Sequence, residues 1–246
     1  MFDVVIGGGS GIGSKVIENL ITQKRSRIVN VDIKPSLHDE VMHNWCGDLR
    51  DPYFVEEIAS GLNELPVLSS LLWSVRYRHK PHESDLEILK SALNVELYPL
   101  IKILELIDKK IQDDSTCICL VSSIASSFVS AQPFAYNIVK AAHIALIRTL
   151  AVKYGDKSDA RFNVISPGIV NLEPYQASQS NHQHILQKSA IPRRDPVNGD
   201  DLARSIIFLL SNMSSAINGA NIIADGGETL LDSYFVAQRT FKLMRD

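Results

Sequence analysis

A tyrosine and a lysine lie four residues apart in the segment YNIVK, as Tyr136 and Lys140. On a helix, this spacing places both side chains on one face. An ammonium group beside a phenol stabilises the phenolate, so Tyr136 is a candidate general acid and base. A tyrosine and a lysine on the surface of an ordinary helix also show this spacing. The other motifs of the chain must therefore distinguish a catalytic pair from a surface pair.

A serine lies close before this pair. Ser123 is near the end of the apolar run STCICLVSSI (115–124), which predicts a strand buried on both faces, as in a parallel sheet. Such sheets bind their ligands beyond the carboxyl ends of the strands. Ser123 is therefore a candidate to hydrogen-bond a substrate oxygen and hold it against Tyr136.

A glycine-rich turn follows the first predicted strand, FDVVIG (2–7). Glycines there permit a tight turn and let backbone N–H groups approach a pyrophosphate at a helix N-terminus, although a merely flexible turn is the alternative. Asp32 ends the next predicted strand (27–32), where a carboxylate can accept hydrogen bonds from both ribose hydroxyls and would repel a 2′-phosphate. The pattern favours NAD over NADP, and the nearby Lys34 weakens that preference slightly. The glycines are Gly7, Gly8, Gly9, Gly11 and Gly13.

Asp48, in CGDLRD, has two interpretations. It ends a further predicted strand, where its carboxylate would meet the adenine edge of a dinucleotide. It could equally be the N-cap of a helix that begins near Pro52.

Strands and helices are predicted to alternate along the whole chain. Apolar runs predict further strands at 67–73, 161–168 and 220–225, and helical spacing predicts helices at 84–110, 133–154 and 200–211. Such alternation predicts one α/β domain over 1–246, a doubly wound parallel sheet with helices on both faces. The longest irregular segment, about 171–190, is polar and is interpreted as an active-site flap.

Composition excludes several classes of protein. The chain has 246 residues, 45% of them hydrophobic, and a formal net charge of -3, which argues against binding nucleic acid by bulk positive charge. The three cysteines form no CxxC pair, which predicts a reducing, cytoplasmic compartment and no zinc site. We predict no metal site, no signal peptide and no membrane span.

Taken together, these motifs resemble the short-chain dehydrogenases/reductases over nearly the whole chain. GGGSGIG resembles the glycine motif of that family, LNVELYP carries Asn94 at the position of its asparagine, and VSSIAS, YNIVK, ISPGIV and IIADGG match further motifs in order. The resemblance implies a Rossmann-like sheet of about seven strands and an oxidoreductase that transfers a hydride between NAD(H) and an alcohol or carbonyl substrate. An NADP-dependent reductase and a non-catalytic nucleotide-binding relative remain the alternatives.

The resemblance also implies a role for each site residue. Tyr136 would exchange a proton with the substrate, Ser123 would orient the substrate oxygen, and Lys140 would hold the nicotinamide ribose. Asn94 would keep a water in line with Lys140, so that the proton reaches solvent. The implied cofactor-binding residues are Gly7, Gly9, Ser10, Gly11, Ile12, Gly13, Asp32, Asp48, Leu49, Trp73, Ser74, Tyr136, Lys140, Pro167, Gly168 and Ile169.

The chain departs from the family pattern after the fourth strand. Trp73, Ser74, Val75 and Arg76 stand where the family carries Asn-Asn-Ala-Gly, within the stretch LLWSVRYRHK (71–80). The apolar half of this stretch predicts a buried strand, and its basic half is interpreted either as a solvated loop or as part of the cofactor edge. We therefore expect altered contacts on the adenosine side. Ile6 and Asn171 replace family threonines, with smaller expected effects.

Substrate selectivity in this family lies in the segment after Pro-Gly and in the C-terminal tail, here about 171–198 and 228–246. His182, His184, Arg193 and Arg194 are polar candidates within the first segment, with a solvated surface as the alternative for each. The apolar tail is predicted to pack on a neighbouring subunit or over the substrate cleft. The resemblance implies a homodimer or homotetramer.

Overall fold

Seven parallel strands form the centre of the protein, in the order β3-β2-β1-β4-β5-β6-β9. The structure is a computed structural model and describes residues 1–172 and 180–245. The strand order reverses between β1 and β4, which creates the crevice where doubly wound sheets bind ligands. This topology confirms the predicted parallel sheet. The strands are β1 (Phe2–Ile6), β2 (Ile28–Asp32), β3 (His43–Cys46), β4 (Leu68–Trp73), β5 (Cys117–Val121), β6 (Arg161–Pro167) and β9 (Asn221–Ala224).

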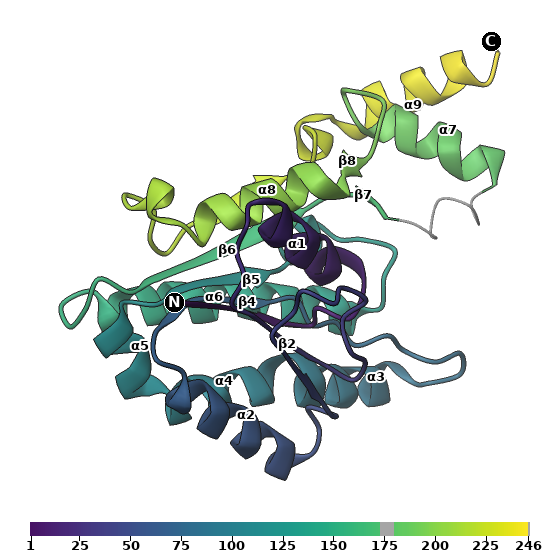
Figure 1. Cartoon of the computed structure of the whole chain (residues 1–246). Helices are drawn as coiled ribbons and strands as arrows, with labels where there is room; N and C mark the ends of the chain where they lie inside the picture. Colours follow the sequence, from purple (N-terminus) through teal and green to yellow (C-terminus); the bar gives the residue numbers. More distant parts are fainter. Residues whose placement is uncertain (173–179, 246) are drawn as a thin grey trace.

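Helices cover both faces of the sheet (Figure 1). Successive side chains of a strand point to opposite faces of the sheet. In β1, Val4 and Ile6 therefore enter the apolar core on one face and Val5 enters the core on the other, so each face needs a cover of helices. Burying each of these side chains contributes about 1.5–3 kcal/mol. The helices α1 (Gly11–Thr22) and α8 (Gly199–Leu209) lie on one face, and α2 (Pro52–Glu64), α4 (Tyr98–Leu106) and α6 (Phe134–Tyr154) lie on the other.

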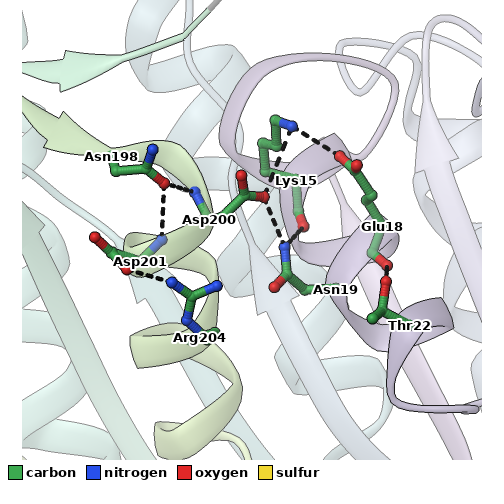
Figure 2. A network of polar contacts seen from close by, with 8 residues as sticks. All are labelled: Lys15, Glu18, Asn19, Thr22, Asn198, Asp200, Asp201 and Arg204. Atoms are coloured by element: carbon green, nitrogen blue, oxygen red, sulfur yellow. Dashed lines mark hydrogen bonds and ion pairs between the residues drawn. The ribbon is translucent and has the colours of Figure 1, made fainter.

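A polar network joins α1 to α8 (Figure 2). The Asn19 amide donates to the Asp200 carboxylate at 3.0 Å, and the Lys15 ammonium lies 2.8 Å from Glu18 and 3.7 Å from Asp200. Asn198 caps α8 by accepting a hydrogen bond from the Asp200 N–H group at 2.8 Å. These partly exposed contacts contribute little individually, but they fix the start of α8 beside the helix that follows the glycine turn.

The long helix predicted at 84–110 is interrupted. It consists of α3 (Asp85–Ala92), a π-helical turn (Leu93–Leu97) and α4, followed by α5 (Asp108–Asp114). The π turn ends two residues before Pro99, whose missing backbone N–H and pyrrolidine ring disturb regular α-helix geometry. Glu96 lies in this turn and is buried.

The prediction of an irregular segment at 171–190 is wrong for residues 181–190. These residues form α7 (Asn181–Ala190), which begins with a capping box between Ser180 and Gln183. The Ser-x-x-Gln spacing was the signal for this helix. Residues 173–179 of the predicted flap lie outside the described residues. Two short strands, β7 (Val170–Asn171) and β8 (Val197–Asn198), pair at the base of the segment.

The C-terminal tail forms α9 (Ser233–Leu243), which packs against α7 at one end of the molecule (Figure 1). The Arg239 guanidinium donates to the carbonyls of Lys188 at 3.2 Å and Ile191 at 3.1 Å, at the end of α7. The tail therefore supports the helix that borders the predicted substrate segment. None of the described helices has the length and apolar character needed to cross a membrane.

Candidate dinucleotide and acid–base site

Gly7 and Gly13, in the glycine turn after β1, have no room for a side chain. Gly7 has a φ of +91°, and a Cβ atom there would lie 2.7 Å from the Ser74 backbone. A Cβ atom on Gly13 would lie 2.1 Å from the Gly7 carbonyl oxygen. The Gly9 N–H group donates to the Asp32 carboxylate at 3.0 Å. The turn thus exposes backbone next to a carboxylate, which fits the pyrophosphate and adenosine ribose of a dinucleotide.

The start of α1 suits an anion. Ser10 precedes the helix, Gly11 and Ile12 lie in its first turn, and this turn carries no acidic residue. The free N–H groups and the positive end of the helix dipole therefore face no opposing side-chain charge.

We expect Asp32→Ser to shift the cofactor preference toward NADPH. The carboxylate would repel a 2′-phosphate, so its removal should improve NADPH binding relative to NADH by about tenfold or more. Fluorescence titration of both cofactors measures the two dissociation constants. Asp39→Ser, which removes an exposed carboxylate of the same β2–β3 connection, should leave the ratio unchanged. An unchanged ratio in Asp32→Ser would contradict the assignment.

Asp48 binds a neighbouring arginine. Its carboxylate accepts hydrogen bonds from the Arg50 backbone N–H at 2.9 Å and from the Arg50 guanidinium at 2.5 Å. These hydrogen bonds and the charge of Arg50 lower the pKa of Asp48. The alternative role of Asp48 as N-cap of α2 is wrong, because Asp51 caps this helix by accepting from the Tyr53 N–H group. Leu49 packs against the core.

Trp73 is the last residue of the strand β4, and Ser74 follows it. Trp73 is fully buried in the core, and its indole N–H has no hydrogen-bond partner among the described residues. The Ser74 N–H group donates to the Ile6 carbonyl at 2.8 Å, which continues the pairing with β1. The backbone pairing between β4 and β1 therefore continues through Ser74.

Tyr136 and Lys140 lie in the first turns of α6, at the carboxyl edge of the sheet. The Lys140 ammonium is 5.8 Å from the centroid of the Tyr136 ring. Ser123 follows β5, and its hydroxyl accepts a hydrogen bond from the Ala125 N–H group at 3.2 Å. The short turn that Ser123 begins packs against α6. The structure thus places the serine segment, the tyrosine and the lysine at one edge.

The Lys140 ammonium binds a carboxylate that sequence reasoning missed. It lies 2.7 Å from Glu96, and the two side chains are only 3% and 2% exposed. The other Glu96 oxygen accepts a hydrogen bond from the Tyr77 N–H group at 2.7 Å. Asn94 is exposed, and its side chain forms no hydrogen bond within the part of the chain that the structure describes.

The position of Glu96 contained a usable signal. It lies four residues after Ala92 and four before Leu100, both of which are buried. A carboxylate on the apolar stripe of a helix requires a charged or hydrogen-bonding partner, because burial of an unpaired charge is costly. The need for such a partner could therefore have been predicted from the helix pattern, whereas its identity as Lys140 could not, because the two residues are 44 positions apart.

His143 lies three residues after Lys140 and is fully buried. Burial and the nearby Lys140 charge lower the pKa of His143 well below its ordinary value. Neither ring nitrogen has a hydrogen-bond partner among residues 1–172 and 180–245. The folded protein therefore holds this imidazole neutral.

We expect His143 to make the protein less stable in acid. Its folded-state pKa is below its unfolded-state pKa, so only the unfolded chain gains this proton as the pH falls below about 6.5. Linkage predicts a loss of up to about 2 kcal/mol in the free energy of unfolding by pH 5, relative to pH 8. Urea denaturation across this range should show a smaller loss for His143→Leu. The exposed-site variant His79→Leu should retain the wild-type loss.

The segment Pro167–Ile169 lies at the end of β6. The N–H group of Ile169, one of the cofactor-binding residues that the resemblance implies, donates to Glu228 at 3.1 Å. A Cβ atom on Gly168 would lie 2.5 Å from the same Glu228 oxygen. Burial, together with the charge of Asp225, raises the pKa of Glu228. Glu228 is thus a further site residue that the sequence did not reveal, directly after the final Gly-Gly.

A separate cavity of about 360 Å³ opens between α7 and α8. Asn171, His184, Lys188 and Arg193 contribute to its lining, whereas Tyr136, Ser123 and Asp32 do not. The geometry of the acid–base residues, and not this cavity, defines the candidate site. Among the described residues, His, Cys, Asp and Glu form no cluster suited to a metal ion.

Comparison with known proteins shows the family to which this fold belongs. Residues 53–229 match the family described as enoyl-(acyl carrier protein) reductase. The chain is 24% identical to D-threitol dehydrogenase from Mycolicibacterium smegmatis over 92% of each chain. It is 30% identical to protein MoaE from Klebsiella aerogenes over 127 residues, an alignment that spans 47% of this chain and 48% of that protein.

Solved structures share the fold. An oxidoreductase of the short-chain dehydrogenase/reductase family from Burkholderia thailandensis superposes with a TM-score of 0.82 at 21% identity, covering 98% of this chain and 97% of that one. A short-chain dehydrogenase family protein from Francisella tularensis gives a TM-score of 0.80 at 21% identity, with coverage of 93% and 98%. This protein is a member of the short-chain dehydrogenase/reductase family of oxidoreductases.

Proposed function

We propose that the protein transfers a hydride between NAD(H) and an alcohol or carbonyl substrate, with Tyr136 as general acid and base. The observation that carries this proposal is the placement of Tyr136 and Lys140 in the first turns of α6, beside the segment that Ser123 begins. These residues lie at the same sheet edge as the glycine turn. The arrangement supports proton transfer next to a bound dinucleotide.

Each residue would perform a distinct task during carbonyl reduction. The Tyr136 hydroxyl would donate its proton to the carbonyl oxygen, and the Ser123 hydroxyl would hold that oxygen in position. The Lys140 ammonium would stabilise the tyrosinate that remains until a solvent proton replaces the transferred one. In alcohol oxidation, the same groups would work in reverse.

The glycine turn, Asp32 and the Tyr136–Lys140 face are the residues that would hold the cofactor. The bound nicotinamide would supply or accept the hydride. Asp32 supports NAD over NADP, because its carboxylate already lies against the turn and would oppose a 2′-phosphate. The Ile169 N–H group would be available to the nicotinamide only after release from Glu228.

We further propose a single-domain cytoplasmic enzyme that acts on a small molecule as a homodimer or homotetramer. Support for assembly comes from α9 and its C-cap residue Met244, because this segment exposes the apolar side chains of Tyr234, Phe235, Phe241 and Met244. Burial of these side chains against a second subunit would remove apolar surface from water.

A cofactor and substrate panel tests the proposed function. NADH and NADPH are first titrated by fluorescence against the full chain, and turnover is then followed with alcohols and carbonyl compounds of varied size and charge. We expect NADH binding together with reduction of at least one carbonyl class. NADH binding without any turnover would instead favour the non-catalytic relative, and binding of neither cofactor would overturn the proposal.

A further inference from the structure

Arg76 lies directly over the candidate acid–base residue. Its guanidinium carbon is 4.6 Å from the centroid of the Tyr136 ring, and one Nη group donates to the Gln132 side chain at 3.1 Å. The sequence left two interpretations of Arg76, a place at the adenosine edge of the cofactor or a solvated loop. In the structure, its contacts are instead with the tyrosine and with the loop that leads into α6.

The backbone on both sides of Arg76 is fixed. The Ser74 N–H group donates to the β1 strand, and the Tyr77 N–H group donates to Glu96 at 2.7 Å. The Tyr77 hydroxyl donates to Glu83 at 2.6 Å. Glu96 is in turn held by Lys140. The buried ion pair therefore determines where this loop runs, and the loop presents Arg76 to Tyr136.

The stacking of Arg76 on Tyr136 leaves N–H groups of the guanidinium available to a ligand. A guanidinium group can stack on an aromatic ring through its face while its five N–H groups remain in the plane of the fork. Gln132 binds one of them, and no carboxylate of the described residues forms an ion pair with Arg76. Arg76 is also exposed, so a ligand can reach it.

The chemistry of this arrangement suits a carboxylate. A planar guanidinium binds a carboxylate through two parallel N–H···O bonds, and such charge-assisted pairs are strong and directional. Lys140 cannot take this role, because its ammonium is buried against Glu96. A substrate whose carbonyl oxygen reaches the Tyr136 hydroxyl would place a carboxylate on a nearby carbon within reach of Arg76.

We propose that Arg76 is the specificity-determining residue for a carboxylate on the substrate, so that this enzyme acts on short oxo acids and hydroxy acids. This inference rests on the proposed function and narrows its substrate class. The cofactor pyrophosphate is the other anion in such a site, but the glycine turn that fits it contacts the Ser74 backbone and not the Tyr136 side of the loop.

The test compares acids with their uncharged esters. The probes are 2-oxobutanoate and 3-oxobutanoate, each with its methyl ester, reduced by wild type, Arg76→Gln and Arg76→Lys. We expect Arg76→Gln to lower kcat/KM for the reactive acid by about 10- to 100-fold, because a hydrogen-bonded charge is lost. Turnover of the ester should fall far less than turnover of the acid, and the dissociation constant for NADH should stay unchanged. Arg78→Gln, which removes an exposed arginine from the same loop, should behave as wild type.

Two measurements, the kinetics with acid and ester and the calorimetric binding of the acids, distinguish a failure of this inference from a failure of the proposed function. Equal effects of Arg76→Gln on acid and ester would overturn the inference while the function stands, as would weaker NADH binding with an unchanged acid preference. If wild type turns over no carbonyl compound, calorimetric binding of the acids to the NADH complex still tests the inference. Binding that Arg76→Gln abolishes would support it, and equal binding by acid and ester would overturn it.

Discussion

Replacing Tyr136 by phenylalanine is expected to lower kcat for carbonyl reduction by about 10²- to 10⁴-fold, the usual contribution of a positioned general acid. The change removes only the hydroxyl group, and the described residues give that hydroxyl no hydrogen bond that folding would lose. The dissociation constant for NADH and the melting temperature should therefore change little. Steady-state kinetics with the best substrate of the panel, together with NADH titration, measures the effect.

Tyr53→Phe is the matched control for this prediction. Tyr53 lies on α2, far along the chain from the site, and it is 81% exposed. Its variant should retain wild-type kcat. Turnover that persists in Tyr136→Phe at the wild-type rate would rule out the acid–base role, even if the cofactor still binds.

The fold was predictable because its signals are local and repeated. The strand β5 is an almost continuous apolar run, as a strand covered on both faces must be, and α6 starts directly after Pro133. The glycines after β1 predicted the turn because their spacing reflects steric limits that any side chain would violate. Local chemistry of this kind can be read without knowledge of tertiary contacts.

The parts of the site that could not be predicted depend on partners distant in sequence. Glu96, in the π turn, pairs with Lys140 of α6, and Glu228, which follows the last strand, accepts a hydrogen bond from the Ile169 N–H group. Arg76 stacks on Tyr136 because Glu96 holds the intervening loop. Motif comparison directs attention to Asn94, whereas the contacts in the structure converge on the carboxylate of the same π turn.

Glu96 therefore links three features of the site. Its carboxylate binds the Lys140 ammonium, fixes the Tyr77 backbone, and through that loop determines the position of Arg76. Both charges are almost fully buried, so their attraction offsets a large desolvation cost only while both remain in place. Stability and the geometry of the site consequently depend on the same pair.

Glu96→Ala is expected to lower the free energy of unfolding by about 3–5 kcal/mol, because it leaves a buried ammonium unpaired. Urea denaturation measures this loss. Glu105→Ala, which removes an exposed glutamate from α4, is the control and should have little effect on the free energy of unfolding.

The double variant Glu96→Leu/Lys140→Met should regain much of the stability that Glu96→Ala loses, since apolar residues often replace a buried ion pair without loss. It should remain inactive, because the ammonium that stabilises the tyrosinate is absent. A Glu96→Ala protein as stable as Glu105→Ala would show that the pair does not organise the site.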